Sequence, residues 1–275
     1  KVCNEPLVPG KTNENSLSDF VKNVEKATAL MRELFPLTPL QKNEFLSQKY
    51  EADVFLKRED LSPVRSYKIR GAFNSIKSAL ERNPNINSFV CASAGNHAQG
   101  VAFICKYLNV NGFIFMPETT PQQKINKTLT FGGRNIEVRL TGDYFDTTLK
   151  SAIEFSKINN AIFLPPFDSE SVIEGQATVL NEILDQSGPT NHPNLIFLAV
   201  GGGGLSSGML KYSQEIRSDI AFRLVEPSGA ASLKMSLESQ RQLTLSRVNN
   251  FVDGAAVARI GGLNFTILKD FLLDH

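Results

Sequence analysis

The stretch Arg65-Ser66-Tyr67-Lys68-Ile69-Arg70-Gly71-Ala72-Phe73 begins a helix around which the rest of the chain is interpreted. Apolar side chains recur downstream at positions 69, 72, 73, 76, 79 and 80, the spacing of one apolar helix face. We expect the Ser66 hydroxyl to cap this helix and Lys68 to lie in its first turn. The helix dipole does not favour a cation there. Most lysines are simply solvated, so other motifs must decide whether Lys68 has a chemical role.

A run of glycines supplies the first of these motifs. Gly201, Gly202, Gly203 and Gly204, followed by Leu205, come after the apolar run 195–200, which predicts a strand buried on both faces of a parallel sheet. Backbone amides can turn inward where no Cβ intervenes, and the next helix adds its dipole, so the run predicts a phosphate site. The alternative is a tight strand-to-helix turn, which needs fewer glycines. The run has neither the dinucleotide-binding spacing nor the Gly-Lys-Ser/Thr of a P-loop.

A second loop, Ser93-Ala94-Gly95-Asn96-His97, lies between the predicted strand 88–92 and a helix. Its amides again face outward at a helix start, where an anion is stabilised. The alternative is an ordinary helix-capping loop with Asn96 as the cap, and both can hold together. For His97 we expect an orienting hydrogen bond rather than metal binding, because no second ligand is near in the sequence.

Taken with a lysine, which can form a Schiff base when it is desolvated and neutral, these loops resemble the pyridoxal-phosphate enzymes of the tryptophan-synthase-β type (fold type II). Within that group the chain is most similar to the threonine dehydratases (threonine deaminases) of the biosynthetic type. The segments 55–66, 38–40, 225–227 and 252–254 belong to the same resemblance, which runs from about residue 20 to the end.

The resemblance implies a role for each motif. Lys68 would bind pyridoxal 5'-phosphate and act as the catalytic base, with Tyr67 packed beside the cofactor. Asn96 would contact the cofactor's ring hydroxyl, and Gly201–Leu205 its phosphate. The substrate carboxylate would lie on Ser93, Ala94, Gly95, Asn96 and His97. The implied reaction converts L-threonine to 2-oxobutanoate and ammonia, a step of isoleucine biosynthesis.

Several alternatives stay open. An L-serine dehydratase or a serine racemase would use the same cofactor, although racemases of this group usually carry a serine where this chain has Ala94. A non-catalytic phosphate-ligand-binding protein would use the glycine run alone, and a structural remnant would use neither. Glu226 resembles a cation-binding position, but the second carboxylate is lacking, so we expect no metal. Glu174 replaces a small residue and has no explanation from the sequence.

Strands and helices alternate along the whole chain, which predicts an α/β doubly wound architecture with parallel twisted sheets flanked by helices. The resemblance implies a small lobe, residues 88–164, inserted into a large lobe of residues 1–87 and 165–275. We expect residues 1–18 to form a loose arm. We also expect the C-terminal part of the large lobe, with the partner of the pyridine nitrogen, to be missing.

Composition limits the remaining possibilities. The 275 residues carry 29 basic and 28 acidic side chains, a net charge of +1, and no clustered basic excess predicts nucleic-acid binding. No apolar run reaches membrane-spanning length. Cys3, Cys91 and Cys105 are too few and too widely spaced for a disulfide framework or a zinc site. We expect a cytoplasmic homo-oligomer, a dimer or tetramer, that acts on a small amino acid.

Overall fold

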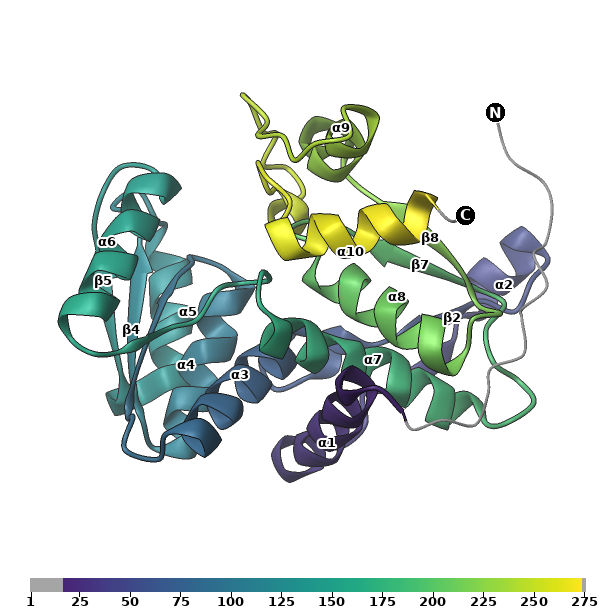
Figure 1. Cartoon of the computed structure of the whole chain (residues 1–275), viewed down its shortest axis with the longest axis horizontal. Coiled ribbons are helices and arrows are strands. Elements are labelled where there is room, and N and C mark those ends of the chain that lie inside the picture. The colour runs from purple at the N-terminus through teal and green to yellow at the C-terminus, as the bar shows by residue number, and fades with distance from the viewer. Residues whose placement is uncertain (1–16, 274–275) are drawn as a thin grey trace.

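The computed structural model describes residues 17–273, so all but the last two residues of the predicted N-terminal arm lie outside the described part. One sheet with its helices forms one side of the molecule, and a second body built on α7 and α8 forms the other (Figure 1). Helices and parallel strands alternate as predicted, and the α/β fold class is confirmed.

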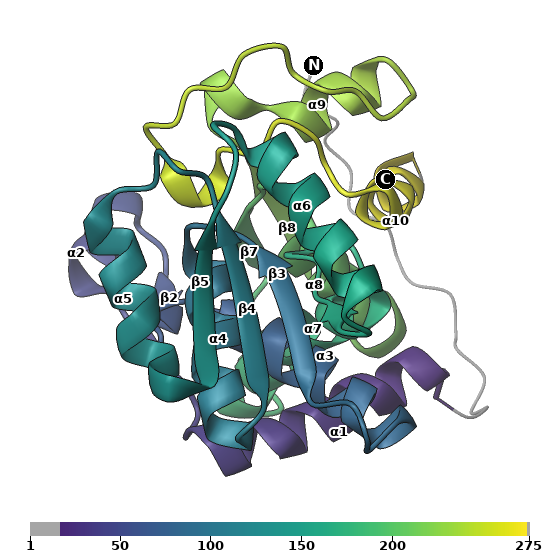
Figure 2. The ribbon, with the colours of Figure 1, turned by 90° about the vertical axis from the view of Figure 1, so that its left-hand side faces the viewer.

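The first body is a four-stranded sheet in the order β5-β4-β3-β6, in which every neighbouring pair is parallel. Figure 2 looks onto this sheet, with β5, β4 and β3 side by side. Its strands and connecting helices are β3 (Ser88–Ala92), α4 (Asn96–Leu108), β4 (Asn111–Met116), α5 (Gln122–Gly132), β5 (Ile136–Leu140), α6 (Phe145–Ile158) and β6 (Ile162–Phe163).

Alternate residues of β3 supply two separate cores. Phe89 and Cys91 pack on the side of α4, whereas Val90 and Ala92 pack on the side of α6. Successive side chains of a strand point to opposite faces, so a strand that is covered on both faces has no polar side. Cys91 is fully buried.

The second body contains α7 (Glu170–Ser187), β7 (Leu195–Ala199), α8 (Gly204–Ile216), β8 (Ala221–Val225), α9 (Ser232–Glu238) and α10 (Gly262–Leu273). The prediction that 195–200 is buried on both faces is wrong. Leu198 and Val200 are buried in the core beneath α8, but Leu195 is 41% and Phe197 68% exposed. Among the described residues β7 pairs only with β8, and nothing described covers its second face.

The N-terminal elements join the two bodies. They are α1 (Asp19–Leu34), β1 (Leu40–Lys42), α2 (Glu44–Tyr50), β2 (Phe55–Lys57) and α3 (Lys68–Arg82). Strands β1 and β2 form an antiparallel pair. Helix α3 lies between α4 and α7. No helix within residues 17–273 is both long enough and apolar enough to cross a membrane.

Glycines bring α3 close to both of its neighbours. A Cβ at Gly100 of α4 would lie 3.2 Å from the carbonyl oxygen of Lys68, and a Cβ at Gly175 of α7 would lie 2.7 Å from that of Arg70. Because both contacts are with backbone, the neighbouring helix cannot give way by rotating a side chain. The first turn of α3 is therefore held in place from two sides.

Candidate active site

Lys68 is the first residue of α3, as predicted, and its side chain reaches the segment that follows β6. Its Nζ donates a 2.7 Å hydrogen bond to the carbonyl oxygen of Pro166 and lies 5.6 and 5.7 Å from the ring centres of Tyr67 and Phe167. Burial lowers the pKa of Lys68 from 10.5 to about 8. On the order of a tenth of the amines are then neutral at pH 7, which gives a usable population of nucleophile.

The predicted cap by Ser66 is wrong. The N-cap residue of α3 is Tyr67, in helical conformation and without a side-chain cap bond. The backbone N–H of Ser66 donates to Ser62 Oγ, whose hydroxyl donates back to the carbonyl of Ser66, so Ser66 is held in a tight turn before the helix. Its own Oγ is buried and has no partner in residues 17–273.

The glycine run follows β7 and leads into α8, as predicted. Gly203 has φ +93, in the region that favours glycine. A Cβ at Gly204 would lie 3.0 Å from the carbonyl oxygen of Phe167, and one at Gly201 3.2 Å from the Cα of Ala255. The loop is thus packed against backbone on two sides, and the first amides of α8 remain available to an anion at the helix start.

The segment after β6 connects the lysine to the glycine run. Pro166 accepts the bond from Lys68, and the next residue, Phe167, packs against Gly202 and Gly204. The site therefore offers backbone amides for a phosphate at one end and a partly neutral amine for a carbonyl group at the other. The sequence does not reveal this role of Pro166, because a backbone carbonyl oxygen that accepts a hydrogen bond leaves no pattern of residue types.

The Ser93–His97 loop lies between β3 and α4. The cap of α4 is Gly95, and Asn96 is the first helical residue, so the capping alternative for Asn96 is wrong. Asn96 is exposed, and no hydrogen bond of its side chain is present among the described residues. Ser93 Oγ accepts from the N–H of Gly95 at 3.2 Å, which shapes the loop. Ala94 contributes no acid or base.

His97 makes an orienting hydrogen bond of the kind that the sequence predicts. Its Nε2 lies 3.0 Å from the carbonyl oxygen of Leu164. Burial and the charge of Lys68 lower the pKa of His97 to about 3, although the hydrogen bond to Leu164 acts in the opposite direction. The imidazole is neutral at physiological pH, and Nε2 carries the proton because it faces a carbonyl oxygen.

Two further positions have clear hydrogen-bond partners. Glu226 accepts backbone N–H bonds from Leu233 and Lys234 at 2.8 and 2.9 Å. Burial raises its pKa, and these bonds oppose the shift. No group of three metal-binding side chains occurs within residues 17–273.

Glu174 accepts a hydrogen bond from the side-chain amide of Asn23, on α1, at 2.7 Å. This bond connects α7 to α1, and the sequence did not predict it. Burial raises the pKa of Tyr67 to about 12.

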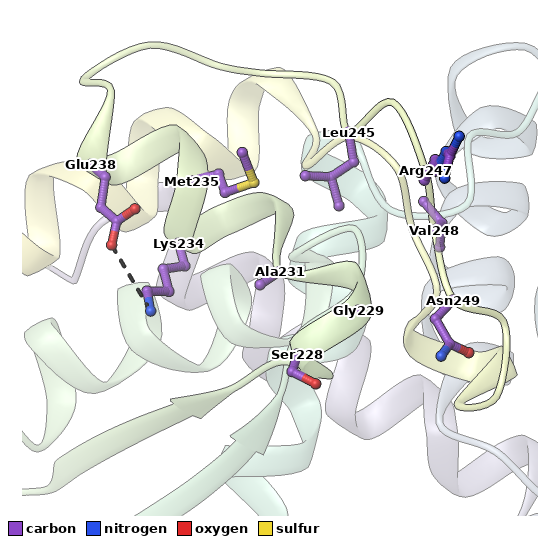
Figure 3. A pocket seen from close by; sticks show the side chains of 10 residues that line it. All are labelled: Ser228, Gly229, Ala231, Lys234, Met235, Glu238, Leu245, Arg247, Val248 and Asn249. Carbon is purple, nitrogen blue, oxygen red and sulfur yellow. Dashed lines mark ion pairs between the residues drawn. The ribbon is translucent and has the colours of Figure 1, made fainter.

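A hollow between α9 and the loop 245–249 lies apart from Lys68, the glycine run and the Ser93–His97 loop (Figure 3). Lys234 is turned toward Glu238, with 3.9 Å between Nζ and Oε1. None of the predicted site residues lines the hollow, so it has no part in the chemistry of Lys68.

Comparison with known proteins gives consistent results. The sequence profile of the family described as "Pyridoxal-phosphate dependent enzyme" matches residues 32–273. The chain is 47% identical to L-threonine dehydratase biosynthetic IlvA of Staphylococcus saprophyticus over 92% of this chain and 60% of that protein. It is 46% identical to the Bacillus subtilis protein of the same name over 94% of this chain and 62% of that one. The chain thus spans about three fifths of these relatives' length.

A solved structure agrees with the sequence relatives. The processed form of threonine deaminase isoform 2 from Solanum lycopersicum superposes with a TM-score of 0.83 and 36% identity. The match covers 97% of this chain and 77% of the tomato protein.

Proposed function

The chain belongs to the family of pyridoxal-phosphate dependent enzymes, and we propose that it catalyses the dehydration and deamination of L-threonine to 2-oxobutanoate and ammonia. The reaction would serve isoleucine biosynthesis. The observation that carries this proposal is the 47% identity to a biosynthetic threonine dehydratase over 92% of the chain.

The proposed site uses the residues in the places described above. Lys68 Nζ would hold the carbonyl end of pyridoxal phosphate, and the amides of Gly201–Leu205 its phosphate. Asn96, whose side chain has no described partner, would bind the ring hydroxyl. The donors of Ser93–His97 would bind the substrate carboxylate. These residues fit pyridoxal phosphate for two reasons. Lys68 has a lowered pKa, and the glycine run, whose close backbone packing requires glycine, lies against Phe167, which also contacts Lys68.

Lys68 would also move the proton. When bound, the cofactor supplies an electron sink for charge that develops at the substrate's α carbon. Once the substrate's amine had replaced Lys68 at the carbonyl end of the cofactor, the freed and neutral Nζ would remove the α proton. The carbonyl of Pro166, 2.7 Å from Nζ, would orient the resulting ammonium group. His97 does not compete as an acid, because its pKa of about 3 leaves the imidazole neutral near pH 7, and a neutral imidazole does not release its remaining N–H proton in this pH range.

L-Serine is the second candidate substrate, because it has the same β-hydroxyl group and lacks only one methyl. Ala94 argues against racemisation of either amino acid, since a racemase needs an acid on the substrate face opposite the lysine. One missing methyl changes binding by only about 1–3 kcal/mol, so both substrates must be assayed.

The test is oxo-acid formation from L-threonine and L-serine, and D-serine formation, with pyridoxal phosphate supplied. We expect 2-oxobutanoate to form faster than pyruvate, with no D-serine. Lys68→Ala should abolish turnover, whereas Lys77→Ala, on the same helix, should retain it. Turnover that survives Lys68→Ala would overturn the assignment. A colourless protein that binds the phosphate ligand equally well without Lys68 would support the non-catalytic alternative.

The cellular setting and assembly belong to the same proposal. We place the enzyme in the cytoplasm and assign a small lobe to 88–164, which contains the whole four-stranded sheet. A homo-oligomer is supported by exposed apolar side chains on α2 and β2, where Phe45, Tyr50 and Phe55 are 71%, 61% and 51% exposed. Light scattering after size-exclusion chromatography tests this, and a monomer at micromolar concentration would contradict it.

A further inference from the structure

The side chain of Asn264, in the first turn of α10, lies between the glycine run and the segment that holds Lys68. It is fully buried. Its Nδ2 donates to the carbonyl oxygens of Gly202 and Phe167, both at 3.0 Å. Its Oδ1 is buried with no partner in the described part of the chain. The side chain therefore acts through its two N–H groups.

The bond to Gly202 fixes the direction of the next amide. The carbonyl of Gly202 also accepts the N–H of Gly261 at 3.1 Å. In a trans peptide the C=O and N–H groups point in opposite directions. Holding the Gly202 carbonyl toward α10 therefore turns the N–H of Gly203 away from α10. A peptide flanked by glycines has few steric limits on its rotation, so each of these two donors helps to fix the direction of the Gly203 N–H.

The bond to Phe167 fixes the other end of the site. The carbonyl of Pro166, one residue earlier, accepts the bond from Lys68 Nζ. One amide group thus ties the backbone that would bind a phosphate to the backbone that orients the lysine. The distance between these two parts must match the length of any ligand that joins them.

Asn264 is itself held firmly. The carboxylate of Asp168 accepts the N–H groups of Gly262 and Leu263 at 2.8 and 3.0 Å, and that of Asn264 at 3.4 Å, and so caps α10. A Cβ at Gly203 would lie 2.8 Å from the Cβ of Asn264. The loop and the helix are therefore in direct contact at this point.

We propose that Asn264 is a positioning residue for phosphate binding: its two N–H groups orient the amide of Gly203 and set the spacing between the glycine run and Lys68. This inference rests on the proposed role of the glycine run as the phosphate site. It predicts that Asn264 contributes to the preference for a phosphorylated ligand rather than to the reactivity of Lys68.

The test compares pyridoxal phosphate with pyridoxal, which has the same aldehyde but no phosphate. Each is titrated into the ligand-free chain, reduced with borohydride, and quantified on the peptide that contains Lys68. Asn264→Leu keeps the size of the side chain and removes both donors. We expect it to reduce the ratio of the two affinities about tenfold, the effect of losing about 1.4 kcal/mol. Binding of pyridoxal should change less than about twofold, within the range of an unperturbed site.

Two further variants separate positioning from general damage. Asn181→Leu makes the same change on α7, where Asn181 donates to Tyr212, and should leave the ratio unchanged. Asn264→Thr keeps one donor and should give a ratio of the two affinities between those of the wild type and of Asn264→Leu. If Asn264→Leu does not fold, the comparison is made with Asn264→Thr. An unchanged ratio in both Asn264 variants, even with weaker binding of both ligands, would overturn the positioning role. A wild-type chain without preference for the phosphorylated ligand would instead overturn the phosphate site, and this inference with it.

Discussion

The reactivity that we propose for Lys68 arises from its surroundings, because burial lowers its pKa to about 8. We predict that the rate of acylation of Lys68 in the ligand-free chain rises with a midpoint near pH 8, since the neutral amine is the nucleophile. Mass spectrometry of the Lys68 peptide over a pH series measures this. A midpoint near the ordinary value of about 10.4 would contradict the environment described for this side chain.

The same shift has a consequence for stability. The pKa of Lys68 is lower in the folded chain than in the unfolded chain, so the unfolded chain binds more protons between the two values. The contribution of Lys68 to the free energy of unfolding therefore increases as the pH rises from about 8 toward 10.5. Lys68→Met should remove this part of the pH dependence.

At the residue scale, the sequence predicted where Lys68 and the glycine run lie in their elements, because a lysine and a row of glycines can be recognised from residue type alone. Lys68 and the glycine run lie where the motifs predicted, connected through Phe167. The carbonyl of Pro166 and the amide of Asn264 were not predicted. Their roles depend on contacts between segments about 100 and 60 residues apart in the chain, which leave no local pattern.

Helices α3 and α7 are joined by a buried ionic cluster as well as by Gly175. The carboxylate of Glu182, on α7, accepts hydrogen bonds from both Nη atoms of Arg70, at 2.7 and 2.8 Å, and from Nζ of Lys57, at 2.8 Å. It also forms an ion pair with Arg32. Arg70 bonds Glu59 as well. Burial alone would raise the pKa of Glu182, but the hydrogen bonds and positive charges of Arg70 and Lys57 have the larger effect and lower it to about 2.

Removing Glu182 should therefore be costly. Glu182→Ala leaves the fully buried Arg70 with only one carboxylate, and we predict a loss of about 3–5 kcal/mol in the free energy of unfolding. Urea unfolding measures it. Glu81→Ala removes a solvent-exposed partner, that of Lys26, and should cost less than about 1 kcal/mol. Equal losses in the two variants would contradict the importance of the cluster.

The cluster also predicts acid sensitivity. Because the pKa of Glu182 is below its ordinary value of 4.5, the stability that it contributes is present above about pH 4.5 and lost as the pH falls toward 2. Wild type and Glu182→Gln should therefore differ most in stability above that range and converge in acid. A difference that persists unchanged at pH 2 would contradict this.

Close helix packing at Gly175 gives a separate prediction. A Cβ there would lie 2.7 Å from the carbonyl oxygen of Arg70, so Gly175→Ala should force α3 and α7 apart. We expect a loss of about 1–3 kcal/mol, despite the better helix propensity of alanine. Gly254→Ala places its Cβ in open space and should change stability by less than about 0.5 kcal/mol. Thermal or urea unfolding compares the two.

At the element scale, periodicity predicted the helix that begins near Lys68, because that helix packs one apolar face. It failed for β7, where a continuous apolar run predicted burial on both faces. The sequence reports which residues can be buried, whereas burial itself depends on which elements cover the strand. Among residues 17–273 only one face of β7 is covered, so Phe197 is exposed.

At the scale of the whole molecule, the proposed site lies where the two bodies meet. Lys68 lies on α3, which packs against the four-stranded sheet body through α4 and against the second body through α7. The glycine run and Asn264 belong to the second body. The alternation of elements predicted the α/β class, and the division into two lobes came only from the family resemblance. Neither predicted that the proposed site would lie between the bodies, because no local pattern determines how distant elements meet.

One measurement tests the central claim most directly: the visible absorption spectrum of the chain with pyridoxal phosphate added, before and after borohydride, with the labelled peptide mapped. We predict a yellow band that borohydride removes, leaving the label on Lys68. Lys68→Ala should show neither band nor label. A label on another lysine, or a wild-type chain that remains colourless, would contradict the account.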